Sequence, residues 1–133
     1  MATAEGSLRG QILGDVVSFK GVPFAAPPVG ALRWREPAPV RPWAGVRNAL
    51  TFGLPCAQAA LDWNNAVAAQ SREDCLTLNV WAPVRHNGAA LPVMVFFPGG
   101  ASIGEDGNIR NSRNITTITN YAITDGIEII SCC

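Results

Sequence analysis

The chain has 133 residues, the size of one small domain, of which 48% are apolar and 15% charged. This composition excludes disordered and fibrous proteins. Ten basic side chains balance ten acidic ones, so charge gives no reason to expect nucleic acid or an anionic membrane as a partner. No apolar run is long enough for a membrane span, and the first residues do not form a signal peptide. We therefore expect a soluble globular protein.

The N-terminal region predicts a β-hairpin followed by a long irregular loop. Two β-favouring runs over residues 7–22 flank a Gly-Asp turn at 14–15. The segment 23–42 is rich in proline, which cannot donate to a hydrogen-bond ladder. Trp34 and Trp43 are expected to hold this part of the chain against a core.

The middle of the chain predicts a weak helix or an Ala-rich loop over residues 57–70. Alternation then predicts a strand over 76–81, and a turn containing His86 follows at 84–91. The apolar residues of this strand that should share one face are Leu76, Leu78 and Val80.

Two further strands are predicted. Residues 93–97 are continuously apolar, which is typical of a strand that is buried on both faces and has a parallel neighbour on each side. A loop of small residues follows at 99–104, and a short strand is expected over 126–130.

Residue usage changes sharply near residue 104. Residues 1–104 hold 18 of the 19 Ala and all ten Pro, whereas Ile, Asn and Thr fill 15 of the 29 positions from 105 to 133. The last segment is either a β-rich end of the same domain or a stretch of different origin, such as a frameshift or a retained intron. We expect a division into 1–104 and 105–133.

Several segments, in order, resemble the type-B carboxylesterase/cholinesterase family. They are the run Phe19–Trp34 with its paired prolines and Leu-Arg-Trp ending, Pro37-Ala-Pro, Trp43-Ala-Gly, Pro55-Cys-Ala-Gln, the Glu-Asp-Cys-Leu core of Ser71–Trp81, and Val93–Ala101. The resemblance covers residues 7–101 and stops at Gly104. It implies the N-terminal portion of an α/β-hydrolase fold, present here mostly as β-strands and long loops. It also implies a small-molecule carboxylic ester as substrate, and neither a cofactor nor a metal.

The family resemblance pairs Cys56 with Cys75 in a disulfide. Such a bridge would favour secretion or another oxidising compartment. The alternative is two free, buried thiols in a cytosolic protein. Cys132 and Cys133 are adjacent and lack the spacing of metal ligands.

Gly99, Gly100 and Ala101 resemble the family's oxyanion loop. Ester hydrolysis builds negative charge on the carbonyl oxygen, and small residues let a substrate approach backbone N–H donors. The resemblance makes the N–H groups of Gly100 and Ala101 two of the donors, with Gly99 supporting them. Pro98 and Ser102 depart from the usual pattern, which has a His or aromatic residue before the glycines and an aromatic residue after them. The alternative is a plain Gly-rich turn.

The run from Gly100 to Gly104 also fits the Gly-x-Ser-x-Gly pattern of a nucleophile elbow, with Ser102 at its centre. We reject Ser102 as nucleophile, because an elbow should open a helix and residues 105–111 are a poor helix start. In this fold the order is Ser, acid, His, yet the single histidine, His86, precedes Ser102. Nucleophile and base are therefore expected to be absent from these 133 residues.

Two smaller motifs have local explanations. Glu73 and Asp74 are adjacent, so they point in different directions and do not form an acid/base dyad. The resemblance gives this acidic position a structural role, with Arg33 as candidate partner. Asn114-Ile-Thr116 fits the short acceptor motif for N-glycosylation.

The sequence thus favours a serine esterase segment that carries the oxyanion loop and is inactive by itself. The alternatives are a non-catalytic, cholinesterase-like binding or adhesion protein, and the product of a truncated gene.

Overall fold

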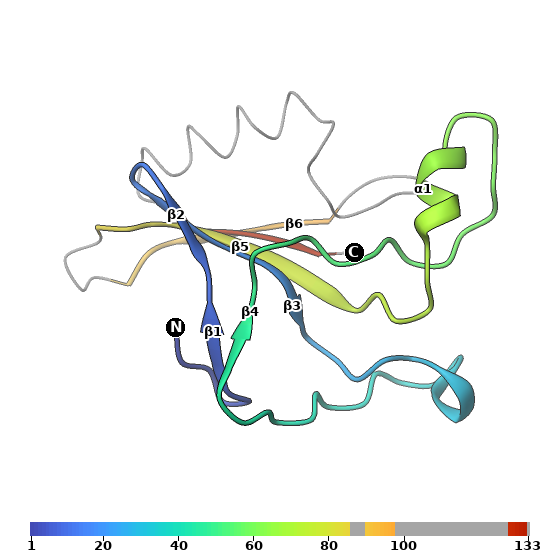
Figure 1. Cartoon of the computed structure of the whole chain (residues 1–133), viewed down its shortest axis with the longest axis horizontal. Helices are drawn as coiled ribbons and strands as arrows, with labels where there is room; N and C mark the ends of the chain where they lie inside the picture. Colours follow the sequence, from blue (N-terminus) through green and yellow to red (C-terminus); the bar gives the residue numbers. More distant parts are fainter. Residues whose placement is uncertain (86–89, 98–127, 133) are drawn as a thin grey trace.

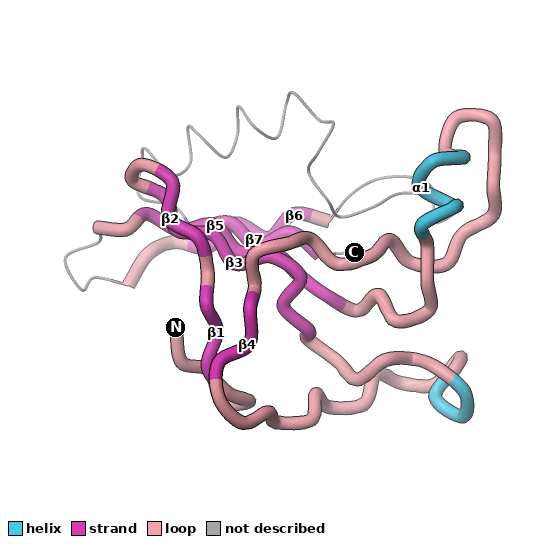
Figure 2. Tube along the Cα trace, in the orientation of Figure 1, coloured by secondary structure: helices cyan, strands magenta, loops and turns pink. Residues whose placement is uncertain are grey.

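The computed structural model describes residues 1–85, 90–97 and 128–132, and these form two sheets joined by long loops (Figures 1 and 2). The larger sheet has the order β2-β3-β5-β7-β6, and the smaller one pairs β1 with β4. The strands are β1 (Ser7–Arg9), β2 (Gln11–Leu13), β3 (Val16–Pro23), β4 (Val46–Asn48), β5 (Thr77–Pro83), β6 (Val93–Phe96) and β7 (Glu128–Cys132). The helices of the described part are η1 (Gly30–Leu32) and α1 (Asn65–Gln70).

The predicted N-terminal hairpin is confirmed, with one interruption. β2 and β3 pair antiparallel from Gln11↔Ser18 to Leu13↔Val16, and Gly14 makes the turn with φ of 59°. The strand is interrupted at Gly10. The residues before it form β1, which lies outside the hairpin and pairs parallel with β4. A single N-terminal run therefore contributes to both sheets.

The core lies where these two sheets meet. Its buried members come from β1, β3, β5 and the residue after β4, and they are Leu8, Phe19, Val80 and Ala49. Val80 of this cluster and Leu78, which packs against it, come from the predicted apolar face of β5, as expected. Leu76 precedes β5, and its carbonyl accepts a hydrogen bond from the Phe24 N–H at 3.2 Å.

The two tryptophans within and directly after the proline-rich segment behave oppositely. Trp43 packs against the core, and its Nε1–H donates to the Ser7 carbonyl at 3.0 Å, which confirms the expectation for this residue. Trp34 is 95% exposed, so the expectation that it packs on a core is wrong in this chain. The reason is local: η1 ends at Arg33, and Trp34 follows it with a left-handed φ of 58° that directs the ring to solvent.

A bulge in β3 is built around Gly21. The register with β5 shifts between Phe19 and Val22, and Gly21 has φ of 64°. Its N–H donates to Oδ1 of Asn79 at 2.9 Å, and Asn79 is fully buried on β5. The amide side chain thus satisfies a backbone donor that the bulge removes from the ladder.

Gly21→Ala is expected to lower the free energy of unfolding by about 2 to 3 kcal/mol, because it combines a left-handed φ with a close backbone contact. A Cβ at Gly21 would lie 2.7 Å from the Thr51 carbonyl oxygen. Gly14→Ala is the matched control, since Gly14 has a similar φ and a Cβ added there would meet nothing within 4 Å. It should lose only about 1 kcal/mol. Urea unfolding of both variants measures the difference, and equal losses would show that the contact is harmless.

The strands predicted at 93–97 and 126–130 correspond to β6 and β7. β7 lies between β5 and β6, antiparallel to β5 (Val80↔Ile130) and parallel to β6 (Val95↔Ile130). Ile130 packs against the core, so the segment of unusual composition contributes to it. The expectation that 93–97 is buried on both faces is wrong in this chain: Val93 is 51% and Met94 41% exposed. The reason is position, because β6 comes last in the sheet order and β7 is its one strand neighbour in the described residues.

Candidate functional site

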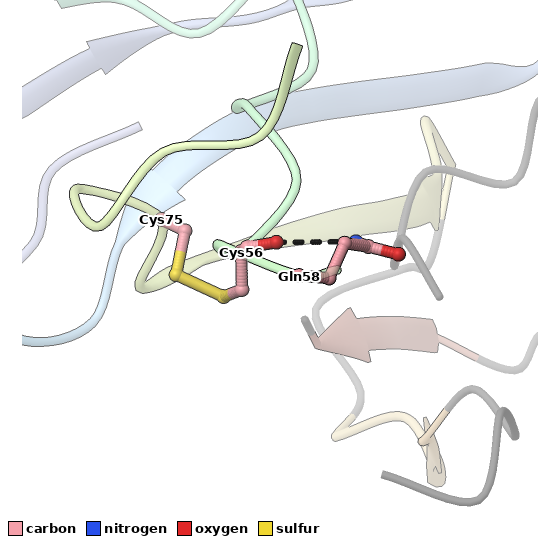
Figure 3. The surroundings of a disulfide bond; sticks show 3 residues. All are labelled: Cys56, Gln58 and Cys75. Carbon is pink, nitrogen blue, oxygen red and sulfur yellow. Dashed lines mark hydrogen bonds between the residues drawn. A yellow bond between two sulfur atoms is a disulfide. The ribbon is translucent and has the colours of Figure 1, made fainter. Parts of the chain in front are cut away.

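The loop between β4 and β5 is closed by a disulfide between Cys56 and Cys75, whose Cα atoms lie 4.9 Å apart (Figure 3). Cys75 is buried. The base of the loop is reinforced where the Arg72 N–H donates to the Pro55 carbonyl at 2.9 Å, and Gln58 Nε2 donates to the Cys56 carbonyl at 3.1 Å. The pairing implied by the family resemblance is confirmed, and the alternative of two free thiols is wrong.

Inside this disulfide loop, Asn64 organises the backbone. It is 4% exposed, and its Oδ1 accepts a hydrogen bond from the Leu61 N–H at 2.7 Å. Its Nδ2 donates to the Gln58 side chain and to the Ala59 carbonyl, each at 3.1 Å. Asn64 stands at the N-cap of α1, yet its side chain turns back into the loop and does not cap the helix. The expected weak helix therefore begins only at Asn65, after an ordered loop.

Sequence reasoning missed Asn64. The available signal was an Asn directly before an Ala-rich run, which is typical of a helix N-cap. That signal would have placed the helix start correctly. It would not have revealed the hydrogen bonds back into the loop.

Asn64→Ala is expected to lower the free energy of unfolding by about 2 kcal/mol, because it removes a buried amide that makes three hydrogen bonds within the loop. Asn65→Ala is the control, since Asn65 is the next residue and is exposed. It should change stability by less than about 0.5 kcal/mol. Hydrogen exchange over residues 57–70 locates the effect: faster exchange in Asn64→Ala alone is the expected result. Similar exchange in the two variants would contradict the role given to Asn64.

An ion pair joins the proline-rich segment to the end of the disulfide loop. Arg33 Nε lies 2.5 Å from a Glu73 carboxylate oxygen. The candidate partnership of Arg33 with this acidic position is thereby confirmed. Both side chains are partly exposed, at 52% and 39%, so the pair contributes little net stability.

The predicted chemistry falls outside the described residues. Gly99, Gly100, Ala101 and Ser102 lie there, as do His86, the Asn114–Thr116 motif and Cys133. The structure describes the strand that leads to this segment, because β6 ends at Phe96, three residues before Gly99 in the sequence. In Figure 1, β6 and β7 both run toward the side of the molecule that carries α1 and the disulfide loop. In open α/β sheets, ligands bind at the carboxyl ends of such parallel strands.

The described ranges, 1–85, 90–97 and 128–132, contain neither a cluster of metal ligands nor a membrane-spanning helix. Among those residues no group of three or more His, Cys, Asp or Glu side chains is arranged to hold a metal ion. The helices described there are also too short and too polar to cross a membrane.

Sequence comparison places clear matches along most of the chain. Residues 1–122 match the model of the carboxylesterase family. The chain is 45% identical over 107 residues to the fumonisin B1 esterase of Sphingopyxis macrogoltabida. The aligned region covers 80% of this chain and 20% of that protein. It is 38% identical over 114 residues to the phenmedipham hydrolase of Pseudarthrobacter oxydans. This alignment covers 82% of this chain and 23% of the hydrolase.

Solved structures give the same result. A PNB esterase superposes with a TM-score of 0.80 and 28% identity over 98% of this chain and 26% of its own. A carboxylesterase of Geobacillus stearothermophilus gives a TM-score of 0.75 and 30% identity over 98% of this chain and 25% of its own. The chain thus spans about a fifth of the length of these curated relatives and about a quarter of the solved ones. The family match continues past Gly104 to residue 122, and a different origin for residues 105–133 stays a prediction.

Proposed function

Because the chain belongs to the carboxylesterase family and has part of the α/β-hydrolase fold, we propose that it is the N-terminal part of a serine esterase for small-molecule carboxylic esters. The observation that carries this proposal is the superposition of nearly the whole chain on a PNB esterase. The family match over residues 1–122 supports it independently.

In this proposal the chain supplies the oxyanion loop. The N–H groups of Gly100 and Ala101 donate to the carbonyl oxygen as it becomes negative, and Gly99 leaves room for the substrate. Donors of this kind are worth about 3 to 4 kcal/mol each in the transition state. The assignment is supported by sequence position, because Gly99 follows three residues after the carboxyl end of β6, a strand that pairs parallel with β7.

The remaining catalytic groups are assigned to sequence outside these 133 residues. A serine nucleophile needs a base, and the single histidine of the sequence, His86, lies before Ser102 and not after it. Ser102 is therefore not the nucleophile in this proposal, and the 133-residue chain does not hydrolyse esters alone. The disulfide supports folding in an oxidising compartment.

A p-nitrophenyl ester assay tests both halves of the proposal. The purified 133-residue chain is expected to show no hydrolysis above the buffer rate. A hybrid in which residues 1–122 replace the matched part of the fumonisin B1 esterase is expected to hydrolyse the ester. Hydrolysis by the isolated chain that disappears in Ser102→Ala would overturn the rejection of Ser102. A folded hybrid without hydrolysis would favour the alternative of a non-catalytic binding protein.

A further inference from the structure

β2 forms the edge of the larger sheet that lies opposite to β6. It comes first in the sheet order, and β3 is its one strand neighbour in the part of the chain that the structure describes. Leu13 and Val16 close the two-residue turn Gly14-Asp15, so they exchange the first hydrogen bonds of the hairpin. Because such pairs alternate along an antiparallel ladder, the N–H and C=O of Ile12 point away from β3.

The residues of β2 do not discourage a further strand. Natural edge strands do so with charged residues, prolines or bulges within their length. β2 contains none of these, and its apolar side chains are open, since Ile12 is 64% and Leu13 78% exposed. Gly10 and Gly14 stand on either side of β2 and have no side chain that would hold a second backbone away. β2 therefore has room for one short antiparallel strand on its outer side.

The charges that flank β2 are complementary to themselves. Arg9 precedes β2 by two residues and Asp15 follows it by two, and both side chains are exposed. Neither side chain forms an ion pair within the described ranges. When two copies of β2 pair antiparallel about a two-fold axis at Ile12, Arg9 of each copy lies opposite Asp15 of the other. A parallel pairing in the same register would place like charges side by side, so the charges favour the antiparallel arrangement.

We propose that β2 is the interface of a weak dimer of this chain, in which two β2 strands pair antiparallel and join the two larger sheets into one. Ile12 of each copy exchanges two main-chain hydrogen bonds with Ile12 of the other. Leu13 lies opposite Gln11, and Arg9 pairs with Asp15. Because β2 has only three residues, the contact is small, and the dimer forms at high protein concentration. This proposal goes beyond the proposed function, because it concerns assembly and needs no role for the oxyanion loop.

Sedimentation velocity of the full 133-residue chain over a range of concentrations tests for the dimer. The mean sedimentation coefficient is expected to rise from the value of a monomer toward that of a dimer. The rise should be smaller at about 1 M salt, which screens the exposed charges. Hydrogen exchange at low and high concentration locates the contact. The amide of Ile12 should exchange at least about threefold more slowly at the high concentration, and the amides of residues 93–97 should not change.

Charge reversal tests the antiparallel register. Arg9→Asp places two carboxylates opposite each other at both ends of the contact, and Asp15→Arg does the same with two guanidinium groups. Each single variant should therefore weaken dimerisation at least about fivefold. The double variant Arg9→Asp, Asp15→Arg restores opposite charges and should recover the affinity of the parent within about twofold. Arg35→Asp is the matched control, since Arg35 is exposed in the loop after η1, and it should change the affinity by less than about twofold.

Ile12→Pro gives a test that does not depend on charge. Proline is tolerated in an edge strand where the N–H faces solvent, so the pairing of β2 with β3 should survive. The variant lacks the outward N–H of Ile12, and its dimerisation should fall at least about tenfold. Thermal unfolding checks that the hairpin and the core remain intact.

The hybrid esterase that carries residues 1–122 extends the measurement to a longer protein, because β1 to β6 are then followed by the rest of an esterase. It is expected to dimerise with the same response to charge reversal. A hybrid that dimerises but does not hydrolyse esters would count against the proposed function and leave the dimer standing. A hydrolytic hybrid that stays monomeric would do the reverse.

Four results with the 133-residue chain would also overturn the proposal. They are a sedimentation coefficient that does not change with concentration, slower exchange at residues 93–97 in place of Ile12, a double variant that dimerises as weakly as Arg9→Asp, and an equal loss of affinity in Arg35→Asp and Arg9→Asp.

Discussion

A hybrid esterase carrying residues 1–122 of this chain is expected to lose about 10²- to 10³-fold in kcat when Ala101 is replaced by proline. Proline has no backbone N–H, so Ala101→Pro removes one proposed donor to the developing oxyanion. Because that donor acts mainly in the transition state, kcat and kcat/KM should fall together, with little change in KM. Steady-state kinetics with a p-nitrophenyl ester measures all three quantities.

Ala101→Gly is the matched control for this loss. Glycine keeps the N–H and removes only a methyl group, so the Gly variant should retain kcat within about tenfold of the parent hybrid. Thermal unfolding of the three hybrids checks that proline has not disrupted the domain. An equal fall in kcat for Ala101→Gly and Ala101→Pro, or no fall for Ala101→Pro, would contradict the proposed role of the Ala101 N–H as an oxyanion donor.

Removal of the disulfide is expected to lower the free energy of unfolding of the 133-residue chain by about 3 kcal/mol. Cys56 and Cys75 are 19 residues apart, and cross-linking them restricts the unfolded chain more than the folded one. The double variant Cys56→Ala, Cys75→Ala removes the bridge and keeps small apolar side chains in its place. Urea unfolding of the parent and the variant, both in non-reducing buffer, measures the difference.

A reducing agent provides the control for the disulfide. Dithiothreitol should destabilise the parent by a similar amount and leave the double variant unchanged. Hydrogen exchange should show the greatest loss of protection over residues 57–74, the segment that the bridge encloses. A double variant as stable as the oxidised parent would show that the hydrogen bonds of Asn64 and the loop base are sufficient to hold the segment.

Local patterns predicted most of the strands but not their arrangement. Alternation and apolar runs placed both ends of β5, β6 and β7 within two residues of their observed positions, since these signals are carried by neighbouring residues. The insertion of β7 between β5 and β6, and the pairing of β1 with β4, join segments far apart in sequence. No short-range pattern contains that information.

The two tryptophans also show that local sequence patterns do not predict contacts between distant segments. Trp34 lies in the proline-rich segment and Trp43 directly follows it, and apolarity predicts burial for both. Among the residues that the structure describes, Trp43 meets a distant partner, the Ser7 carbonyl in β1, and packs on the core, whereas Trp34 does neither. The burial of a tryptophan in an irregular segment therefore depends on contacts that propensity does not encode.

The candidate site was predicted mainly through family resemblance. Spacing alone left Cys56 and Cys75 open between a disulfide and free thiols, and nothing local linked Arg33 to Glu73 across forty residues. The structure supports both pairings. Asn64 was not predicted, because its role depends on a loop conformation that brings the Leu61 N–H and the Ala59 carbonyl to its side chain, and no local pattern encodes that conformation.

The position of β7 between β5 and β6 constrains the order in which the sheet can be completed on the ribosome. β5 and β6 emerge first, but neither pairs with the other in the finished sheet; both pair with β7, which is synthesised about thirty residues after β6. Until β7 appears, β6 is an unpaired apolar strand in the nascent chain. Contacts between distant segments also form slowly. A chain that ends before Glu128 would present β6 to chaperones or to other nascent chains. Truncated chains that lack β7 should therefore aggregate much more than chains that include it.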